Sequence, residues 1–128
     1  MRLLLDTHVF LWLLGDPDRL GKGIGPLGDP GNELFLCAAS SWEIAVKVRM
    51  GRLTLPEDPK RYVPGRMRVI GAQPLVVEHS HALAVAGLPA LHRDPFDRLL
   101  VAQARDLRLR IVTADEQIAR YEVETLLV

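Results

Sequence analysis

Short apolar runs alternate along the chain with segments whose apolar residues recur every three or four positions. An uninterrupted run of four to six apolar residues is typical of a strand that is buried on both faces. We therefore expect strands at Arg2–Leu5, Glu33–Cys37, Leu75–Val77 and Arg110–Thr113, and a fifth at Val123–Leu127.

Helix signals fall between these predicted strands. Asp94-Pro95 is the clearest, because it combines an N-cap residue with proline at the first helical position, and it predicts a helix to about Leu107. Ser40 or Ser41 is expected to cap a helix that ends at Met50, before Gly51. Shorter helices are expected at 9–14, 19–24, 56–67, 82–87 (capped by Ser80) and 115–120.

The alternation of strands and helices predicts an α/β fold. Helical connections between strands place the strands parallel and cover both faces of the sheet. The 128 residues contain no repeat or interior linker, so we expect a single domain over residues 1–128.

Composition narrows the classes of function. Lys+Arg and Asp+Glu balance at 16 each, which argues against a protein that coats nucleic acid through a general basic field. The single cysteine, Cys37, forms no internal disulfide and suits a reducing compartment. No run reaches the length of a membrane span, so the sequence predicts a cytoplasmic protein with no membrane partner.

Four acidic residues are expected at one edge of the predicted sheet. Asp6 follows the first strand, Glu43 opens the helix after the second, Asp97 lies in the first turn of the Asp94-Pro95 helix, and Asp115 follows the fourth strand. Ligands of open parallel sheets bind beyond the carboxyl ends of the strands. Each residue also has a structural explanation, as a helix cap, a partner of a helix dipole or, for Glu43, a capping box with Ser40.

Carboxylates at close range repel one another unless a cation lies among them. Oxygen ligands without a Cys or His cluster favour Mg²⁺ or Mn²⁺ over zinc. One or two such ions could activate water and stabilise the leaving oxygen of a phosphodiester. Asp94 could join this group, but its position before Pro95 already gives it a role as a cap.

Four motifs occur in the order of a known family, and together they span the chain. They are LLLDTH at 3–8, SSWEIAVK at 40–47 with GRL at 51–53, HRDPFDR at 92–98 with AQA at 102–104, and IVTAD at 111–115. The sequence resembles the PIN-domain family, and specifically the VapC-type toxin ribonucleases of toxin–antitoxin systems.

The resemblance implies a three-layer α/β/α sandwich with a central parallel sheet of four or five strands. It implies an endoribonuclease that uses Mg²⁺ or Mn²⁺, acts on RNA as a toxin, forms homodimers and is inhibited by a VapB-like antitoxin. Operator DNA would be contacted only through the antitoxin. Carried onto this sequence, the resemblance makes Asp6, Glu43, Asp97 and Asp115 the catalytic and metal-binding residues, with Thr7 and Thr113 as hydroxyl groups that orient carboxylates or waters.

Basic residues near the predicted site are candidates for RNA contacts, although exposed basic side chains are common. Lys47 lies four residues after Glu43, a spacing that equally predicts an ion pair on one helix face. The candidates are Lys47, Arg49, Arg52, His92 and Arg98.

Two other functions fit parts of the pattern. An aspartyl-phosphate phosphatase would use Asp6 as nucleophile, but it usually has a second acid two residues later, where this chain has His8. A subunit that binds an antitoxin or operator DNA without cutting RNA would not need all four acidic residues. The sequence does not indicate which RNA is cut, or where.

Overall fold

The centre of the molecule is a five-stranded parallel sheet. The computed structural model describes all 128 residues. Its strands lie in the spatial order β3-β2-β1-β4-β5, and every neighbouring pair is parallel. They are β1 (Arg2–Leu5), β2 (Glu33–Cys37), β3 (Ala72–Leu75), β4 (Arg110–Thr113) and β5 (Thr125–Leu127). The predicted α/β class with a parallel sheet is confirmed.

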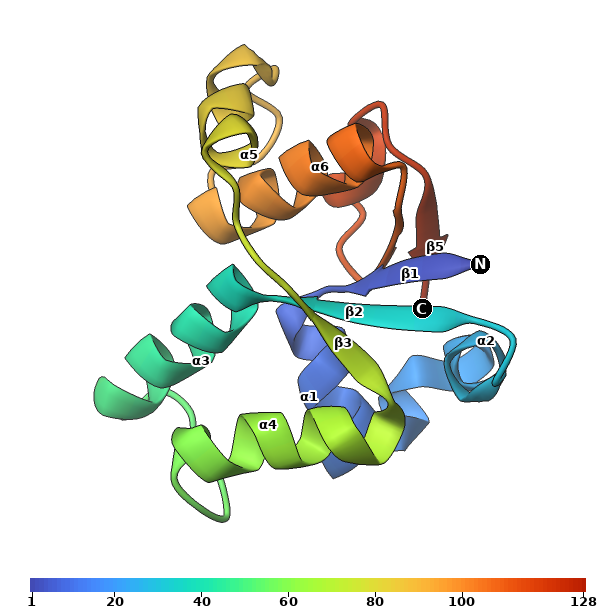
Figure 1. Cartoon of the computed structure of the whole chain (residues 1–128), viewed down its shortest axis with the longest axis vertical. Helices are drawn as coiled ribbons and strands as arrows, with labels where there is room; N and C mark the ends of the chain where they lie inside the picture. Colours follow the sequence, from blue (N-terminus) through green and yellow to red (C-terminus); the bar gives the residue numbers. More distant parts are fainter.

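Helices cover both faces of this sheet, as Figure 1 shows. On one face lie α1 (Thr7–Gly15), α2 (Ile24–Gly28), α3 (Ala38–Arg49) and α4 (Pro59–Ile70). On the other lie α5 (His79–Ala84) and the longest helix, α6 (Pro95–Leu107). Short 3₁₀ segments at Pro17–Gly23, Val85–Gly87 and Ile118–Arg120 complete the connections. None of these helices combines the length and the hydropathy that a membrane-spanning segment requires.

Two hydrophobic cores form because successive strand residues point to opposite faces of the sheet. Leu3 and Leu5 of β1 pack with α1 and its neighbours, whereas Leu4 packs with α6 on the other face. All three leucines are completely buried. This explains why the strands read as continuous apolar runs rather than alternating patterns.

The order of the strands creates a switch point at β1. The chain builds the sheet outward from β1 through β2 to β3, and then crosses back to place β4 on the other side of β1. Leu5 is in register with Val112, so β1 and β4 end side by side. In open parallel sheets this is where a crevice forms and ligands bind. Asp6 and Asp115 are the acidic residues that follow these two strands.

Several predicted boundaries were wrong. Strand β3 covers Ala72–Leu75, whereas the prediction was Leu75–Val77, because Pro74 is accommodated at the edge of the sheet. The predicted helix over 115–120 is only a 3₁₀ turn over Ile118–Arg120, and β5 begins at Thr125 rather than at Val123.

Two predicted helix caps were also wrong. Helix α3 begins directly after β2, where the Ala39 N–H donates to the Cys37 Sγ at 3.3 Å, so neither Ser40 nor Ser41 is the cap. Helix α5 is capped by Glu78 in a capping box with His81, rather than by Ser80. The Asp94 cap of α6 is confirmed, since its carboxylate accepts from the Phe96 N–H at 2.9 Å.

Candidate functional site

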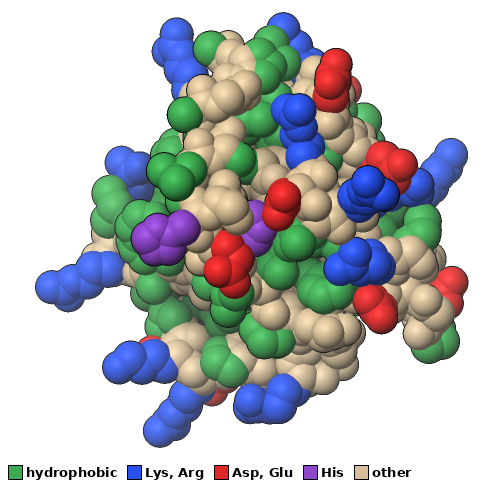
Figure 2. All heavy atoms as spheres, turned by 45° about the horizontal axis from the view of Figure 1, so that its top comes forward, with side chains coloured by type: hydrophobic (Ala, Val, Ile, Leu, Met, Phe, Trp, Pro, Cys, Tyr) green, Lys and Arg blue, Asp and Glu red, His purple; other side chains and the backbone are tan.

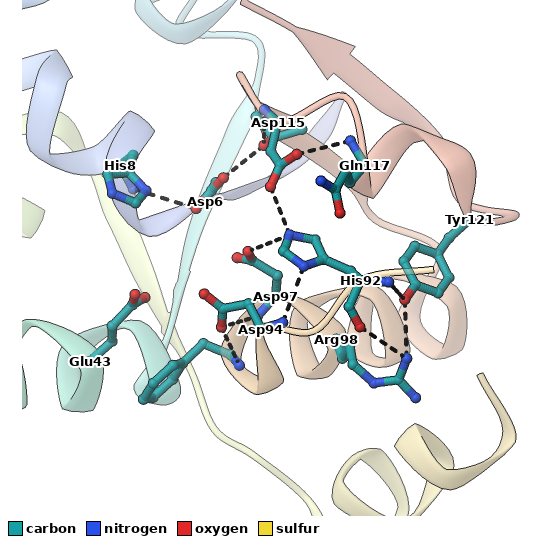
Figure 3. Close-up of polar contacts among 12 residues, drawn as sticks. Asp6, His8, Glu43, His92, Asp94, Asp97, Arg98, Asp115, Gln117 and Tyr121 are labelled. Atoms are coloured by element: carbon teal, nitrogen blue, oxygen red, sulfur yellow. Dashed lines mark hydrogen bonds and ion pairs between the residues drawn. The ribbon is translucent and has the colours of Figure 1, made fainter. Parts of the chain in front are cut away.

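Acidic side chains from four separate elements converge at the carboxyl edge of the sheet (Figure 3). Asp6 lies between β1 and α1, and Asp115 lies two residues after β4. Asp97 comes from the first turn of α6 and Glu43 from the second turn of α3. Burial raises the pKa of Asp97, and repulsion from the carboxylates of Asp6, Glu43 and Asp115 adds to that rise.

Asp6 is held rigidly at the end of β1. Only 4% of the residue is exposed, and its Oδ2 accepts a hydrogen bond of 2.7 Å from the Thr113 hydroxyl. Its other oxygen accepts from the His8 N–H at 3.4 Å, so Asp6 also caps α1. Burial raises the pKa of Asp6 above its usual value, and the Thr113 and His8 hydrogen bonds oppose that rise. The predicted role of Thr113 in orienting a carboxylate agrees with this contact.

Asp97 has the most perturbed carboxyl group of the site. Desolvation by burial, followed by repulsion from Asp6, Asp94, Glu43 and Asp115, raises its pKa to about 8. Its side chain is 14% exposed. Ionised Asp97 is therefore unfavourable in the protein alone, and a bound cation would relieve the repulsion.

Glu43 is buried on the α3 side of the group. The residue is 3% exposed, and its Oε2 accepts from the Lys47 ammonium at 2.7 Å. The capping box that the sequence offered for Glu43 and Ser40 is not formed, because α3 begins before Ser40. Lys47 therefore forms the ion pair with Glu43 that the spacing of the two residues predicts.

His92 lies between two of the carboxylates. Its Nε2 is 2.7 Å from the Asp115 Oδ2 and 3.1 Å from the Asp97 Oδ2. The sequence gave His92 only as a candidate RNA contact, whereas the structure makes it part of the acidic cluster (Figure 3).

A pocket of about 360 Å³ opens at this cluster. Asp94 lines it, and the charge of Asp94 also contributes to the raised pKa of Asp97. The Asp94 carboxylate nevertheless bonds to the Phe96 and Asp97 N–H groups as the cap of α6. The lining residues are Asp6, His8, Trp12, His92, Asp94, Asp97, Ala114 and Asp115.

Two predicted site residues have partners outside the acidic cluster. The Thr7 hydroxyl donates to the Ser40 Oγ at 2.9 Å and so joins α1 to α3, rather than orienting a carboxylate. The Arg98 guanidinium points away from the cluster in Figure 3. It donates to the Tyr121 hydroxyl and to the carbonyl oxygens of Val85, Leu88, Pro89 and His92, at 3.0 to 3.5 Å.

The remaining candidates for RNA contacts, Arg49 and Arg52, are exposed near the end of α3. Basic and acidic side chains are interspersed on the face that Figure 2 shows, in keeping with the net charge of zero. Arg49 and Arg52 as phosphate contacts stay a prediction.

The sequence did not identify Tyr121, whose hydroxyl group holds the backbone of His92 in place. Tyr121 accepts hydrogen bonds from the His92 N–H at 2.9 Å and from Arg98 at 3.1 Å. The only signal for Tyr121 was an aromatic residue between two charged residues, Arg120 and Glu122, and that signal does not identify a partner 29 positions away.

The donor set fits a hard divalent cation. Asp6, Glu43, Asp97 and Asp115 offer only carboxylate oxygens, which Mg²⁺ and Mn²⁺ prefer. The raised pKa of Asp97 is the electrostatic strain that such a cation would remove. One atom each of His92, Asp97 and Asp115 also lie within 4.8 Å of one another.

Comparison with known proteins gives a consistent result. The family model described as "PIN domain" matches residues 3–124. Ribonuclease VapC22 of Mycobacterium tuberculosis is 30% identical over 119 residues, which cover 91% of this chain and 88% of that protein. Ribonuclease VapC16 of the same organism is 51% identical over 53 residues, which cover 41% of this chain but only 38% of that protein.

Solved structures agree with the fold. VapBC2 from Rickettsia felis, bound to a DNA fragment from its promoter, contains a chain that superposes with a TM-score of 0.71. The two chains are 13% identical, and the superposition covers 99% of this chain and 98% of the other. At this identity the similarity establishes a shared architecture.

Proposed function

This chain belongs to the PIN domain family, among relatives named VapC ribonucleases, and from that membership we propose that it is a divalent-metal-dependent endoribonuclease of the VapC toxin type. One observation carries the proposal. Acidic side chains from four separate elements converge at the edge of the sheet, where burial, together with repulsion among these carboxylates, raises the pKa of Asp97 to about 8. Helix capping alone requires no such convergence.

Asp6, Glu43, Asp97 and Asp115 would hold one or two Mg²⁺ or Mn²⁺ ions. When bound, the ion supplies Lewis-acid stabilisation of the negative charge that develops on the phosphate. The protein's contribution is to fix the carboxylates beforehand. Asp6 is held by Thr113 at 2.7 Å, and Glu43 is held by Lys47 at 2.7 Å.

The reaction is hydrolysis of an RNA phosphodiester bond. A water oxygen forms a bond to phosphorus, the bond from phosphorus to a ribose oxygen breaks, and that ribose oxygen takes up a proton. The pocket beside Asp97 and Asp115 gives the phosphate access to the carboxylates. Arg49 and Arg52, which are exposed, would bind neighbouring phosphates. Lys47 would add a positive charge beside Glu43, with which it forms an ion pair.

If this chain is a toxin of the VapC type, we expect a partner protein, the antitoxin, that inhibits it. The solved VapBC2 structure is bound to a DNA fragment from its promoter, and this supports an antitoxin partner for a chain of this fold. We propose the same partner for this chain, together with a homodimeric toxin. A reading frame for a basic, helix-forming protein directly upstream of the gene would support the pairing.

The test is cleavage of a cellular RNA pool by the purified protein with Mg²⁺, with Mn²⁺ and with EDTA. We expect metal-dependent cutting by the wild type and by Asp18→Asn, an exposed carboxylate outside the site. We expect none by Asp6→Asn, which keeps the shape of the side chain but loses its charge. Full activity of Asp6→Asn would refute the mechanism, and no cutting with either metal would favour a subunit that binds without cleaving.

A further inference from the structure

The imidazole of His92 is held between backbone and carboxylates in one orientation. Its Nδ1 accepts a hydrogen bond from the Asp94 N–H at 3.1 Å. Its Nε2 faces the Asp115 Oδ2 at 2.7 Å and the Asp97 Oδ2 at 3.1 Å (Figure 3). The side chain is 13% exposed.

These contacts select one tautomer. A backbone N–H can only donate, so Nδ1 must present a lone pair to Asp94, and the ring hydrogen must lie on Nε2. The Nδ1–H tautomer would place two N–H groups against each other. Carboxylate oxygens accept, so an Nε2–H that points at Asp97 and Asp115 completes a consistent chain of donors and acceptors.

The same argument removes His92 from the candidate metal ligands. A neutral histidine that binds a metal through Nε2 carries its hydrogen on Nδ1, and here Nδ1 is the acceptor for Asp94. The short distances from His92 to Asp97 and Asp115 therefore describe hydrogen bonds rather than a ligand set with a nitrogen donor.

We propose that His92 is a positioning residue that holds the Asp97 and Asp115 carboxylates for cation binding by donating a hydrogen bond from Nε2. This inference rests on the proposed metal-dependent function. Asp115 needs such a partner most, because its side chain is 35% exposed and it lies in a loop rather than in a helix or strand. Its other oxygen is held only by the Gln117 N–H at 2.9 Å.

Hydrogen bonds with Tyr121 and Arg98 hold the loop that carries His92. The His92 N–H donates to the Tyr121 hydroxyl at 2.9 Å, and Arg98 donates to that hydroxyl at 3.1 Å. Arg98 also reaches the His92 carbonyl at 3.5 Å. These contacts keep the imidazole in place without adding a charge to the pocket. Outer partners of this kind typically change metal affinity by about 10–100-fold when they are removed.

The tautomer is tested by ¹⁵N chemical shifts of the imidazole nitrogens at pH 8, with the His92 signals identified by their absence from His92→Gln. We expect Nε2 to carry the hydrogen both without metal and with saturating Mg²⁺. The Nδ1–H tautomer, either without metal or on adding Mg²⁺, would overturn the inference.

The positioning role is tested by calorimetric titration with Mg²⁺ and with Ni²⁺, an ion that binds imidazole well. We expect His92→Ala to lower the affinity for both ions by about tenfold or more, and by similar factors. His92→Gln, which keeps an N–H donor, should recover most of the loss, and exposed His79→Ala should match the wild type. Thermal unfolding of each variant checks that the fold is retained.

The possible results distinguish a failure of the positioning role of His92 from a failure of the proposed metal-dependent function. A much larger loss for Ni²⁺ than for Mg²⁺ would make His92 a direct ligand and overturn the inference. Unchanged affinity in His92→Ala would also overturn it, while leaving the metal site intact. A wild-type protein that binds neither ion would refute the proposed function, and the inference with it.

Discussion

Asp97→Asn is the substitution whose effect on stability the structure defines best. Asparagine has nearly the same shape as aspartate but no charge. Asp97 lies where burial and four neighbouring carboxylates make its ionised form unfavourable. Its backbone N–H, which contributes to the cap of α6 through Asp94, is unaffected by the change. We therefore expect the variant to lose electrostatic strain without losing a helix cap.

The sign and size of the effect follow from the pKa of Asp97. The pKa is 3.8 in the unfolded chain and about 8 in the folded protein, so the folded state binds more protons between these values. The contribution of Asp97 to stability is therefore present in full below pH 3.8 and is lost as pH rises toward 8. The loss is at most about 1.4 kcal/mol per pH unit, or about 3 kcal/mol between pH 5.5 and 7.5.

The assay is urea unfolding in EDTA at pH 5.5, 6.5 and 7.5, with the free energy of unfolding obtained by linear extrapolation. We expect wild-type stability to fall with pH more steeply than that of Asp97→Asn. The variant should be the more stable protein at pH 7.5. Saturating Mg²⁺ should reverse the order at that pH, because it stabilises only a protein that binds it.

Asp18→Asn is the matched control, since Asp18 is exposed and outside the cluster. Its stability should follow that of the wild type at every pH. If Asp97→Asn and the wild type showed parallel pH profiles in EDTA, burial and carboxylate repulsion would not be raising the pKa of Asp97 as inferred. The electrostatic argument for a cation site would then fail.

Two further predictions concern hydrogen bonds behind the site, each measured by urea unfolding at pH 7. Thr113→Val removes the donor to the Asp6 carboxylate and the acceptor of the Asp115 N–H, and should cost about 1.5–3 kcal/mol. Thr7→Val removes a hydrogen bond to a neutral hydroxyl and should cost about 1 kcal/mol, so equal costs would contradict the larger contribution of the Thr113 contacts. Arg98→Lys replaces a planar donor group that reaches Tyr121 and four carbonyl oxygens, and should lower the free energy of unfolding by about 2 kcal/mol or more. A change within experimental error would mean that these contacts do not stabilise the fold.

The fold class was predictable because the strands are short apolar runs that only a sheet covered on both faces can bury. The runs Arg2–Leu5, Glu33–Cys37 and Arg110–Thr113 gave three strands with the bounds that the structure has. Strand β3 was misplaced because the apolar residues Val76 and Val77 lie outside the sheet and are exposed, whereas Gln73 and Pro74 lie within it. At an edge strand, backbone pairing decides the boundary, and apolar character does not.

The acidic residues were predictable because each follows a strand or opens a helix at a recognisable motif. Their interactions were not. The hydrogen bond from Thr113 to Asp6 spans 107 positions, and the contact of His92 with Asp115 spans 23. Such distances in sequence are closed only by packing β4 beside β1 and α6 against the sheet. For the same reason, the hydrogen bonds of Arg98 to Tyr121 and to the backbone could not be predicted from the sequence.

The most direct measurement is calorimetric titration of Mg²⁺ into the wild type, Asp6→Asn, Glu43→Gln and Asp18→Asn. If the carboxylates form one cation site, the wild type and Asp18→Asn should bind with the same affinity. Asp6→Asn and Glu43→Gln should each bind at least about tenfold more weakly, although they lie on different elements. Equal binding by all four proteins would contradict a shared metal site, and with it the proposed ribonuclease mechanism.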